Sequence, residues 1–451
     1  MTFFQDSIVA ISTPYGSSGI AVIRLSGENS IEIVDLFFKG KIKLEKVKSN
    51  SIIYGKIQEN KHIIDDVLIS IFRAPHSYTG ENVVEISCHG NMFIANKILE
   101  LLLTKCRLAE KGEFTQRAFL NNKMDLTEAE AVGDLLNAKT NFSHIAAMEQ
   151  LHGSLHNRIS KLLTSITDIR TLLELEIDFL EQDLPFIDIK EIQEKIRAIL
   201  IELENLVITG EEGLILREGL MVSLVGAPNV GKSSIFNSLL ETERAIVTPI
   251  PGTTRDYLEE AISLKGYLVR IFDTAGIRNT DDSIEKIGIE RSFDIVKKSH
   301  KVLFIIDGKE NLEEYKKLGE LIDEQKIIKV LNKADLFEKS EIDNFIKKNY
   351  IICSTTNKNG LESLKEILLK DIEISEDQLH KGILSNARHI AAVKKTIESI
   401  KIAIQSIDDQ LGFEFTAFDL KEASSALEEI IGIVSTDDFL NKIFDNFCIG
   451  K

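Results

Sequence analysis

A glycine-rich loop near the middle of the chain holds the first residues whose types and spacing could do chemistry. It runs from Gly226 to Ser233 as Gly-Ala-Pro-Asn-Val-Gly-Lys-Ser, after the apolar run Leu220–Val225 and before a helical pattern over Ser234–Leu240. Glycines let a backbone wrap around phosphate oxygens, and the loop amides and the helix N-terminus supply a positive field. The strand–loop–helix order therefore predicts a phosphate-binding loop.

The side chains of this loop have separable expected tasks. We expect Lys232 to reach the β- and γ-phosphates of a nucleotide and to act in catalysis, and the Ser233 hydroxyl to hold Mg²⁺. Asn229 either coordinates a monovalent cation, together with backbone carbonyls of Thr248–Thr253, or hydrogen-bonds the loop's own backbone; spacing leaves both open. The loop residues expected to contact nucleotide are Asn229, Val230, Gly231, Lys232, Ser233 and Ser234.

Two motifs further along suit a metal-bound triphosphate. Thr254, in the pair Thr253-Thr254, is the natural second hydroxyl ligand for Mg²⁺. The expected strand Leu268–Phe272 leads into Asp273-Thr274-Ala275-Gly276, which places a carboxylate near the outer shell of the metal and a flexible glycine at the γ-phosphate. The residues expected on this side of the site are Thr248, Thr253, Thr254, Asp273, Thr274, Ala275 and Gly276.

The base is expected to meet Asn332-Lys333-Ala334-Asp335, which closes another strand. Asp335 can accept two hydrogen bonds from guanine N1 and N2, which adenine cannot offer, so an unpaired carboxylate would disfavour ATP. Asn332 and Lys333 complete the predicted base contacts. The segment Ser354–Asn357 after strand Tyr350–Cys353 occupies the place of a base-supporting loop, although its second residue departs from the commoner Ser-Ala. Five elements in this order predict a GTPase domain.

The water-positioning residue of this site is less obvious. Ras-like proteins carry a glutamine after the Asp-x-x-Gly motif, and this chain has Ile277 there, which can neither donate nor accept a hydrogen bond. Glu285, on Thr280–Ile287, is the candidate for positioning water. A solvated glutamate at a helix start is the alternative, and spacing alone favours that alternative.

The elements around these motifs fall into three textures. From Ile8 to about Phe119, short β-branched runs and one helix-like stretch, Met92–Leu103, predict a small α+β domain. Helical periodicity follows from about Leu126 and returns from Ser385, with the α/β nucleotide segment between. We therefore predict a multidomain α+β and α/β protein in which a Ras-like P-loop G domain interrupts a helical domain. The expected segments are 1–120, 121–215 (helical), 216–377 (G domain) and 378–451 (helical, with the tail).

Two apolar stripes support the helical segments. Ile390, Val393, Ile397, Ile400 and Ile404 are expected to pack on one face in the second block. In the first block, residues stepping by three and four are expected to line one helix face: Ile145, Met148, Leu151, Leu155, Ile159, Leu162, Ile166, Ile169 and Leu173.

Composition narrows the setting of the protein. The 451 residues are 43% apolar, with no uncharged apolar run of membrane-spanning length and no secretion signal, so we expect a cytoplasmic protein without a membrane partner. The four cysteines are far apart and suggest neither zinc nor disulfides. A net charge of −17 argues against sequence-blind DNA binding, while leaving a local basic patch for another nucleic acid possible.

Several motifs resemble one family over the whole chain, the bacterial tRNA-modification GTPases MnmE (also TrmE). They are Gly19–Gly27 (GIAVIRLSG), Ser77–Glu81 (SYTGE), Gly112–Asn121 (GEFTQRAFLN), the phosphate loop, Gly252–Asp256 (GTTRD) and the terminal Cys448–Lys451 (CIGK). The resemblance implies a homodimer formed through the N-terminal domains and a flavoprotein partner, MnmG (GidA), in a heterotetramer or larger complex. Together they would add a carboxymethylaminomethyl group to C5 of the wobble uridine of certain tRNAs.

The resemblance also implies ligands that spacing alone did not fix. Potassium would be held by the Asn229 side chain and by the backbones of Thr248, Ile250 and Thr253, and would pair G domains across the dimer. Glu285 matches the catalytic glutamate of the family, which reverses the preference from spacing.

A formyl-tetrahydrofolate one-carbon donor, 5-formyltetrahydrofolate, is implied in the N-terminal domain, near Arg24, Glu81, Lys123 and the terminal Lys451. Cys448 matches the functional cysteine of the tail. From the residues alone, Arg24 and Glu81 could form a surface pair, Lys123 a solvated charge, and Cys448 a buried thiol.

Two other functions compete with a tRNA-modifying GTPase. One is a regulatory GTPase switch in ribosome or RNA assembly, although the acidic chain carries no recognisable RNA-binding module. The other is a folate-dependent one-carbon transferase in which the G domain is regulatory.

Overall fold

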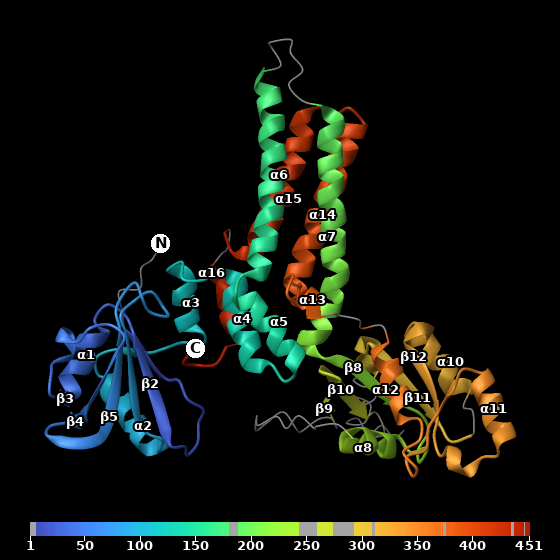
Figure 1. Ribbon diagram of the computed structural model, residues 1–451, viewed down its shortest axis with the longest axis horizontal. Helices are drawn as coiled ribbons and strands as arrows, with labels where there is room; N and C mark the ends of the chain where they lie inside the picture. The colour runs from blue at the N-terminus through green and yellow to red at the C-terminus, as the bar shows by residue number, and fades with distance from the viewer. Residues whose placement is uncertain are drawn as a thin grey trace, which may run out of the picture. The chain divides into compact units, whose positions relative to one another are not determined.

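The computed structural model describes residues 6–179, 188–242, 259–273, 293–308, 312–370, 372, 376–433, 437–445 and 447–451 (Figure 1). The described residues form two compact units. The first draws on Met1–Leu136, Gln150–Thr164 and Ser424–Lys451, and the second on Asn137–Glu149 and Ser165–Ala423. Among the described helices, none combines the length and the apolar character that a membrane span requires. The segment boundaries at 120, 215 and 377 stay predictions.

A seven-stranded sheet dominates the N-terminal part of the first unit, in the order β3-β4-β5-β6-β2-β1-β7 among the described residues. Its neighbours pair antiparallel, except for the parallel pair β1 and β7. Alternation of apolar and polar residues along β2, β5 and β6 gives each of these strands one buried face, whereas all four residues of β1 are buried. The strands are β1 (Ile8–Ile11), β2 (Ile20–Ser26), β3 (Phe38–Gly40), β4 (Ser51–Glu59), β5 (His62–Phe72), β6 (Val83–His89) and β7 (Arg107–Leu108).

Helices α1 (Ser30–Phe37) and α2 (Met92–Leu102) cover one face of this sheet. The helix predicted over Met92–Leu103 is confirmed as α2, whereas α1 was not predicted, because its eight residues give too short a periodic signal. Further helices of this unit are α3 (Glu113–Leu120), α4 (Leu126–Asn137) and α16 (Asp437–Phe444). Leu126 of α4 packs in a small core with Leu440 and Phe444 of α16.

The first predicted apolar stripe lies on two helices, so its assignment to one helix face is wrong. Helix α5 (Asn141–Leu151) ends before α6 (Ser154–Phe179) begins, and Gly153 between them has φ +80°, a left-handed conformation that glycine adopts without strain. On α6, the stripe residues are buried as expected: Leu155, Ile159, Leu162, Ile166, Ile169 and Leu173.

The two helical blocks pack together, as predicted for one domain built from two chain segments. Helices α7 (Ile189–Glu218) and α14 (Ala387–Asp408) lie side by side (Figure 1), with Lys394 and Lys401 of α14 paired to Glu211 and Glu204 of α7. A side chain at Gly213 of α7 would overlap the Leu384 carbonyl, so glycine allows the backbone at Leu384 to pack directly against α7. Helix α15 (Phe413–Ile431) follows α14, and α13 (Glu376–Leu379) precedes it.

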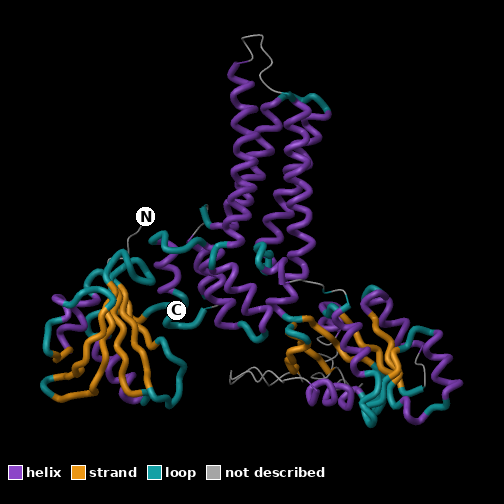
Figure 2. The backbone as a smooth tube through the Cα atoms, in the orientation of Figure 1, coloured by secondary structure: helices purple, strands orange, loops and turns teal. Residues whose placement is uncertain are grey.

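The G segment contains a six-stranded sheet among the described residues, in the order β13-β12-β11-β8-β10-β9. Figure 2 draws the strands in orange and the helices in purple. All its described pairs are parallel except β9 with β10, and the buried strands are rich in Val, Ile and Leu, as two-sided burial requires. The strands are β8 (Leu220–Val225), β9 (Glu259–Leu264), β10 (Tyr267–Asp273), β11 (Lys301–Ile306), β12 (Ile327–Leu331) and β13 (Ile351–Ile352); the helices are α8 (Lys232–Thr242), α10 (Leu312–Leu321), α11 (Lys339–Lys347) and α12 (Leu361–Leu369).

Candidate nucleotide-binding site

The predicted phosphate loop joins the carboxyl end of β8 to the start of α8. Ligands of open parallel sheets bind at the carboxyl ends of the strands, and an anion prefers a helix N-terminus. Gly226 has φ +149°, and an added Cβ there would lie 2.2 Å from the Ile305 carbonyl oxygen. At Gly231, with φ +94°, it would lie 2.1 Å from Asn332 Nδ2. The loop therefore needs glycine at both positions to form this cradle.

Lys232 and Ser233 begin α8 in the positions expected of a phosphate and a metal ligand. The Lys232 side chain is buried, and its Nζ donates to the carbonyls of Gly226 and Ala227, so the amine lies inside the loop. Ser233 is exposed, and its hydroxyl donates to Asp273 Oδ2 at 3.2 Å. The structure thus brings together the hydroxyl and the carboxylate that suit Mg²⁺ and its outer shell.

Asn332 ties the base-recognition motif to the phosphate loop. Its side chain is 1% exposed, and its Nδ2 donates to the Val230 carbonyl at 3.0 Å. The Asn332 Oδ1 atom is buried without a hydrogen-bond partner among the described residues. An orphaned buried acceptor is costly, so this atom fits a site in which a ligand supplies the missing donor.

Asp335 lies where two loops meet, as the guanine prediction requires. The Ser354 hydroxyl donates to Asp335 Oδ1 at 2.5 Å, and the Ala334 amide donates to the Cys353 carbonyl at 3.1 Å. Ser354 also accepts the Asn357 amide at 3.4 Å, so the segment Ser354–Asn357 supports the motif despite its unusual second residue. The Asp335 carboxylate is thereby oriented before any base is bound.

Lys333 has a partner that was not predicted. Its Nζ donates to the Asn229 carbonyl at 2.7 Å and to Asp307 Oδ2 at 3.0 Å. Asp307 directly follows the apolar strand β11, and a carboxylate at the carboxyl end of a buried parallel strand is the signal that could have found it.

Several predicted residues of the G segment lie outside the described residues. They are Thr248, Ile250, Thr253, Thr254, Thr274, Ala275, Gly276, Ile277 and Glu285. The other predicted nucleotide contacts converge at the carboxyl ends of β8, β10 and β12.

In the N-terminal sheet, Arg24 pairs with Glu85 rather than with Glu81. Arg24 Nη2 lies 2.7 Å from Glu85 Oε1, and the guanidinium stacks 5.6 Å from the Tyr78 ring centre. The alternative of an Arg24–Glu81 surface pair is therefore wrong, because β2 and β6 place Arg24 directly across from Glu85.

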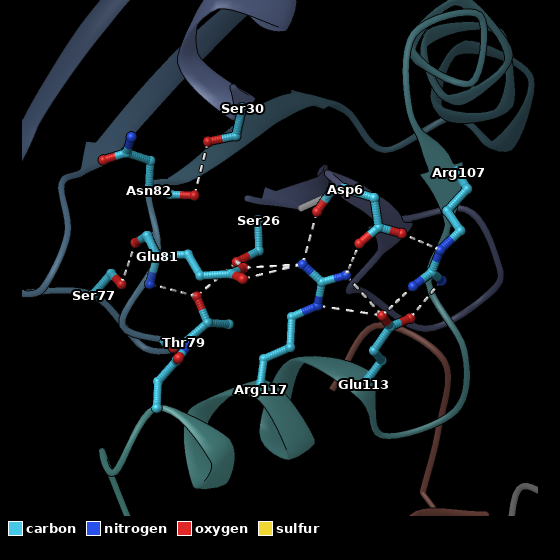
Figure 3. Close-up of polar contacts among 11 residues, drawn as sticks. Asp6, Ser26, Ser30, Ser77, Thr79, Glu81, Asn82, Arg107, Glu113 and Arg117 are labelled. Carbon is cyan, nitrogen blue, oxygen red and sulfur yellow. Dashed lines mark hydrogen bonds and ion pairs between the residues drawn. The ribbon is translucent and has the colours of Figure 1, made fainter. Parts of the chain in front are cut away.

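Glu81 instead belongs to an ion-pair network centred on the buried Arg117, with Asp6 and Arg107 at its exposed side (Figure 3). The Arg117 side chain is 0% exposed and contacts Glu81, Glu113 and Asp6 at 3.2, 2.9 and 2.9 Å. Ser26 donates to Glu81 Oε2 at 2.7 Å, and Arg107 bridges Asp6 and Glu113. This network was not predicted, although Glu113 and Arg117 stand four residues apart in the quoted motif.

The C-terminal tail lies against the N-terminal sheet. The backbones of Ile449 and Lys111 pair in an isolated antiparallel β-bridge, and the Ser12 hydroxyl donates to the Gly450 carbonyl at 3.2 Å. Burial, followed by the charge of Arg24, lowers the pKa of Lys451, although Glu85 and Cys448 pull it upward. The positive charge of Arg24 therefore acts on the terminal lysine, and the place of Lys451 in a ligand pocket stays a prediction.

The other two predicted residues of this region show different environments. Lys123 is exposed, and its Nζ donates to the Pro75 carbonyl at 3.0 Å, with its stem beside Gly80. Cys448 is exposed, so its alternative as a buried thiol is wrong.

Comparisons with known proteins agree with the N-terminal sheet and with the nucleotide-binding segment described above. A family model described as the MnmE helical domain matches residues 126–448, and one described as the N-terminus of the GTP-binding protein TrmE matches residues 7–123. The tRNA modification GTPase MnmE of Clostridioides difficile (strain 630) is 42% identical over 467 residues, which cover 100% of this chain and 100% of that protein. The chain belongs to the MnmE family.

Other MnmE proteins match equally completely. The tRNA modification GTPase MnmE of Aquifex aeolicus (strain VF5) is 41% identical over 451 residues, covering 99% of this chain and 100% of that protein. Among solved structures, the G domain of the T. maritima FeoB iron transporter matches with 26% identity, 34% of this chain, 99% of that chain and a TM-score of 0.26. MnmE membership confirms the family resemblance and the predicted fold class of N-terminal, helical and P-loop G domains.

Proposed function

We propose that this tRNA modification GTPase acts within a complex that adds a carboxymethylaminomethyl group to C5 of the wobble uridine of certain tRNAs. The observation that carries the GTPase part is the joining of Lys232, Asn332 and Asp335 through the loops at the carboxyl ends of one parallel sheet. Full-length similarity to tRNA modification GTPases supports tRNA modification as the process in which the GTPase acts.

Binding of the triphosphate would use groups that already face the loop. The Lys232 amine, now hydrogen-bonded to two loop carbonyls, would turn to the β- and γ-phosphates, because a bond from an ammonium to an anionic oxygen is stronger than one to a neutral carbonyl. Loop amides at the start of α8 would hold the remaining phosphate oxygens. Mg²⁺ bound by Ser233 and Thr254, with Asp273 nearby, would neutralise phosphate charge.

The base side of the site would select guanine. Asp335, oriented by Ser354, accepts from N1 and N2 of guanine. Adenine would leave the Asp335 carboxylate facing a ring nitrogen acceptor, which is unfavourable. GTP is therefore the proposed substrate.

The catalytic cation and the water-positioning group are proposed from the family resemblance. Asn229 is exposed at φ +65° in the phosphate loop, where its side chain is available to a potassium ion shared with Thr248, Ile250 and Thr253. Such a cation would stabilise charge developing in the transition state, and Glu285 would position the attacking water.

Hydrolysis by the wild-type protein should be about tenfold or more faster in KCl than in NaCl at equal ionic strength. Asn229→Gly should remove this difference while changing GTP affinity little, because glycine adopts φ +65° without strain and the lost contact matters in the transition state. Steady-state phosphate release and equilibrium nucleotide binding measure the two effects. Equal wild-type rates in both salts would exclude the cation role.

A homodimer would form through the N-terminal domain. Helices α1 and α2 cover one face of its sheet, and the opposite face carries Ile20, Ile52, Tyr54 and Leu68, which are 60, 69, 63 and 45% exposed. Strand register places all four on the same face. Apolar area of this kind supports an interface with a second copy.

The folate donor would bind beside Arg24 and Lys451, whose charges suit the carboxylates of its glutamate tail. Tyr78 offers an aromatic face at the same place. Glu81 fits less well as a direct contact, because its carboxylate accepts from Arg117 and Ser26. The flavoprotein MnmG is the proposed partner, and tRNA the proposed substrate of the complex.

The function is tested by tRNA nucleoside analysis in a strain lacking this chain. Wild-type protein should restore the modified wobble uridine, and Lys232→Ala should not. Defective ribosome assembly in that strain, with normally modified wobble uridine, would favour the assembly switch instead. Full modification by Lys232→Ala would favour a folate-dependent transferase with a regulatory G domain.

A further inference from the structure

Three loops meet at the Lys333 amine. Lys333 belongs to the base motif, Asn229 to the phosphate loop, and Asp307 to the segment after β11. In the sheet, β11 lies between β12 and β8, so the end of β11 lies between the loops that those two strands carry. Asp307 is thus placed by topology beside the Lys333 amine, which itself contacts the phosphate loop.

We propose that Asp307 is a positioning residue for GTP binding, which holds the Lys333 amine on the Asn229 carbonyl and so couples the base loop to the phosphate loop. The proposal rests on the proposed GTP binding. Asp307 itself would touch no nucleotide, because its carboxylate is already directed at Lys333 Nζ, 3.0 Å away.

A lysine side chain needs such an anchor to hold one geometry. Its four-carbon stem has several rotamers, and the Lys333 side chain is 36% exposed, so water competes for the amine. Asp307 has less freedom, because its short side chain has fewer rotatable bonds and its backbone directly follows the buried strand β11. The short carboxylate therefore fixes the long amine.

The phosphate loop gains a specific support from this contact. Asn229 is a non-glycine residue at φ +65°, a left-handed conformation that costs energy for most side chains. Lys333 is itself at φ +56°, and its amine bonds the carbonyl of Asn229. Losing the anchor would let both left-handed residues relax, and the loop would have to be reordered by the nucleotide.

Asp307→Asn should therefore raise the dissociation constants of GTP and GDP together, by about threefold to tenfold, since the ion pair is partly exposed. The turnover at saturating GTP should change less than the affinity, because an ordering cost falls on binding. Asp307→Glu, which keeps the charge, should restore part of the affinity. Equilibrium titration with a fluorescent GDP analogue measures these constants on the full-length protein.

A double-mutant cycle separates positioning from general damage. Asp307→Asn should cause no further loss in a Lys333→Met background, because the partner that it positions is gone. Glu211→Gln is the matched control, since it breaks another lysine–carboxylate pair, at 3.3 Å between α7 and α14, and should leave affinity unchanged. Additive losses in the cycle, or unchanged affinity in Asp307→Asn, would overturn the proposal. Failure of the wild-type protein to bind GTP would instead overturn the proposed function.

Discussion

Arg117→Met should destabilise the N-terminal domain by about 3–5 kcal/mol, the largest stability effect expected from one residue of this sheet. Arg117 is fully buried and is shared by Glu81, Glu113 and Asp6 (Figure 3). Methionine fills similar space but offers no donors, so Glu113, which is 2% exposed, would keep only Arg107 as a cationic partner within the described part of the chain. Unpaired buried carboxylates cost more than the pair contributes.

Hydrogen exchange in the full-length protein measures this effect locally, which is needed because a multidomain chain has no single unfolding free energy. Amides of β1, β2 and β6 should lose protection together in Arg117→Met. Lys56→Met is the control: it breaks an exposed pair with Asp66 at 3.5 Å, worth at most about 1 kcal/mol. Unchanged protection in Arg117→Met would show that the network contributes little.

Acid should weaken the same region through the carboxylates of this network. Burial raises the pKa of Glu113, but hydrogen bonds from Arg107, from the Glu110 amide and from Arg117 outweigh it and hold that pKa below its ordinary value. The pKa of Asp6 is likewise lowered, by Arg107 and Arg117 against burial. A carboxyl group whose pKa is lower in the folded than in the unfolded chain stabilises the folded domain at higher pH. This contribution is lost as the pH falls below about 4. Arg117→Met should show a smaller loss.

Asp335→Asn should lower the affinity for GTP by roughly a thousandfold, the largest functional effect expected from a conservative change in the site. The amide offers one acceptor and one donor where guanine presents two donors, so a hydrogen bond becomes a clash of donors. Xanthine nucleotides carry a carbonyl in place of the N2 amine and should bind the variant better than GTP does. The Ser354 hydroxyl, 2.5 Å from Asp335 Oδ1 in the wild type, can still reach the amide oxygen.

Competition titrations with GTP, xanthosine triphosphate and ATP test this reversal. Asp323→Asn is the matched control, because it makes the same change at a helix-capping position of the G segment, where asparagine caps equally well. If Asp335→Asn kept the wild-type preference for GTP over xanthosine triphosphate, Asp335 would not read the base.

Short stretches of sequence determined the phosphate loop and its neighbours. Leu220–Val225 forms β8 as predicted, and the helix expected at Ser234–Leu240 is present within α8. This agreement follows because apolar runs, glycines and a helix start act over a few residues. The order of the motifs likewise predicted the G-domain class, because the phosphate loop, Asp273 and Asn332 lie at the carboxyl ends of β8, β10 and β12 in one sheet.

Contacts between distant residues had to be decided by the tertiary structure. Arg117 and Asp6 meet across 111 positions, and Lys333 and Asn229 across 104. The opposite charges of Arg24 and Glu81 suggested a pair, yet strand register places Arg24 opposite Glu85, and Glu81 pairs with Arg117. Charge and motif specify what chemistry a residue can do, because these are properties of its side chain. Which partner it meets depends on sheet register and helix packing, which only the folded chain sets.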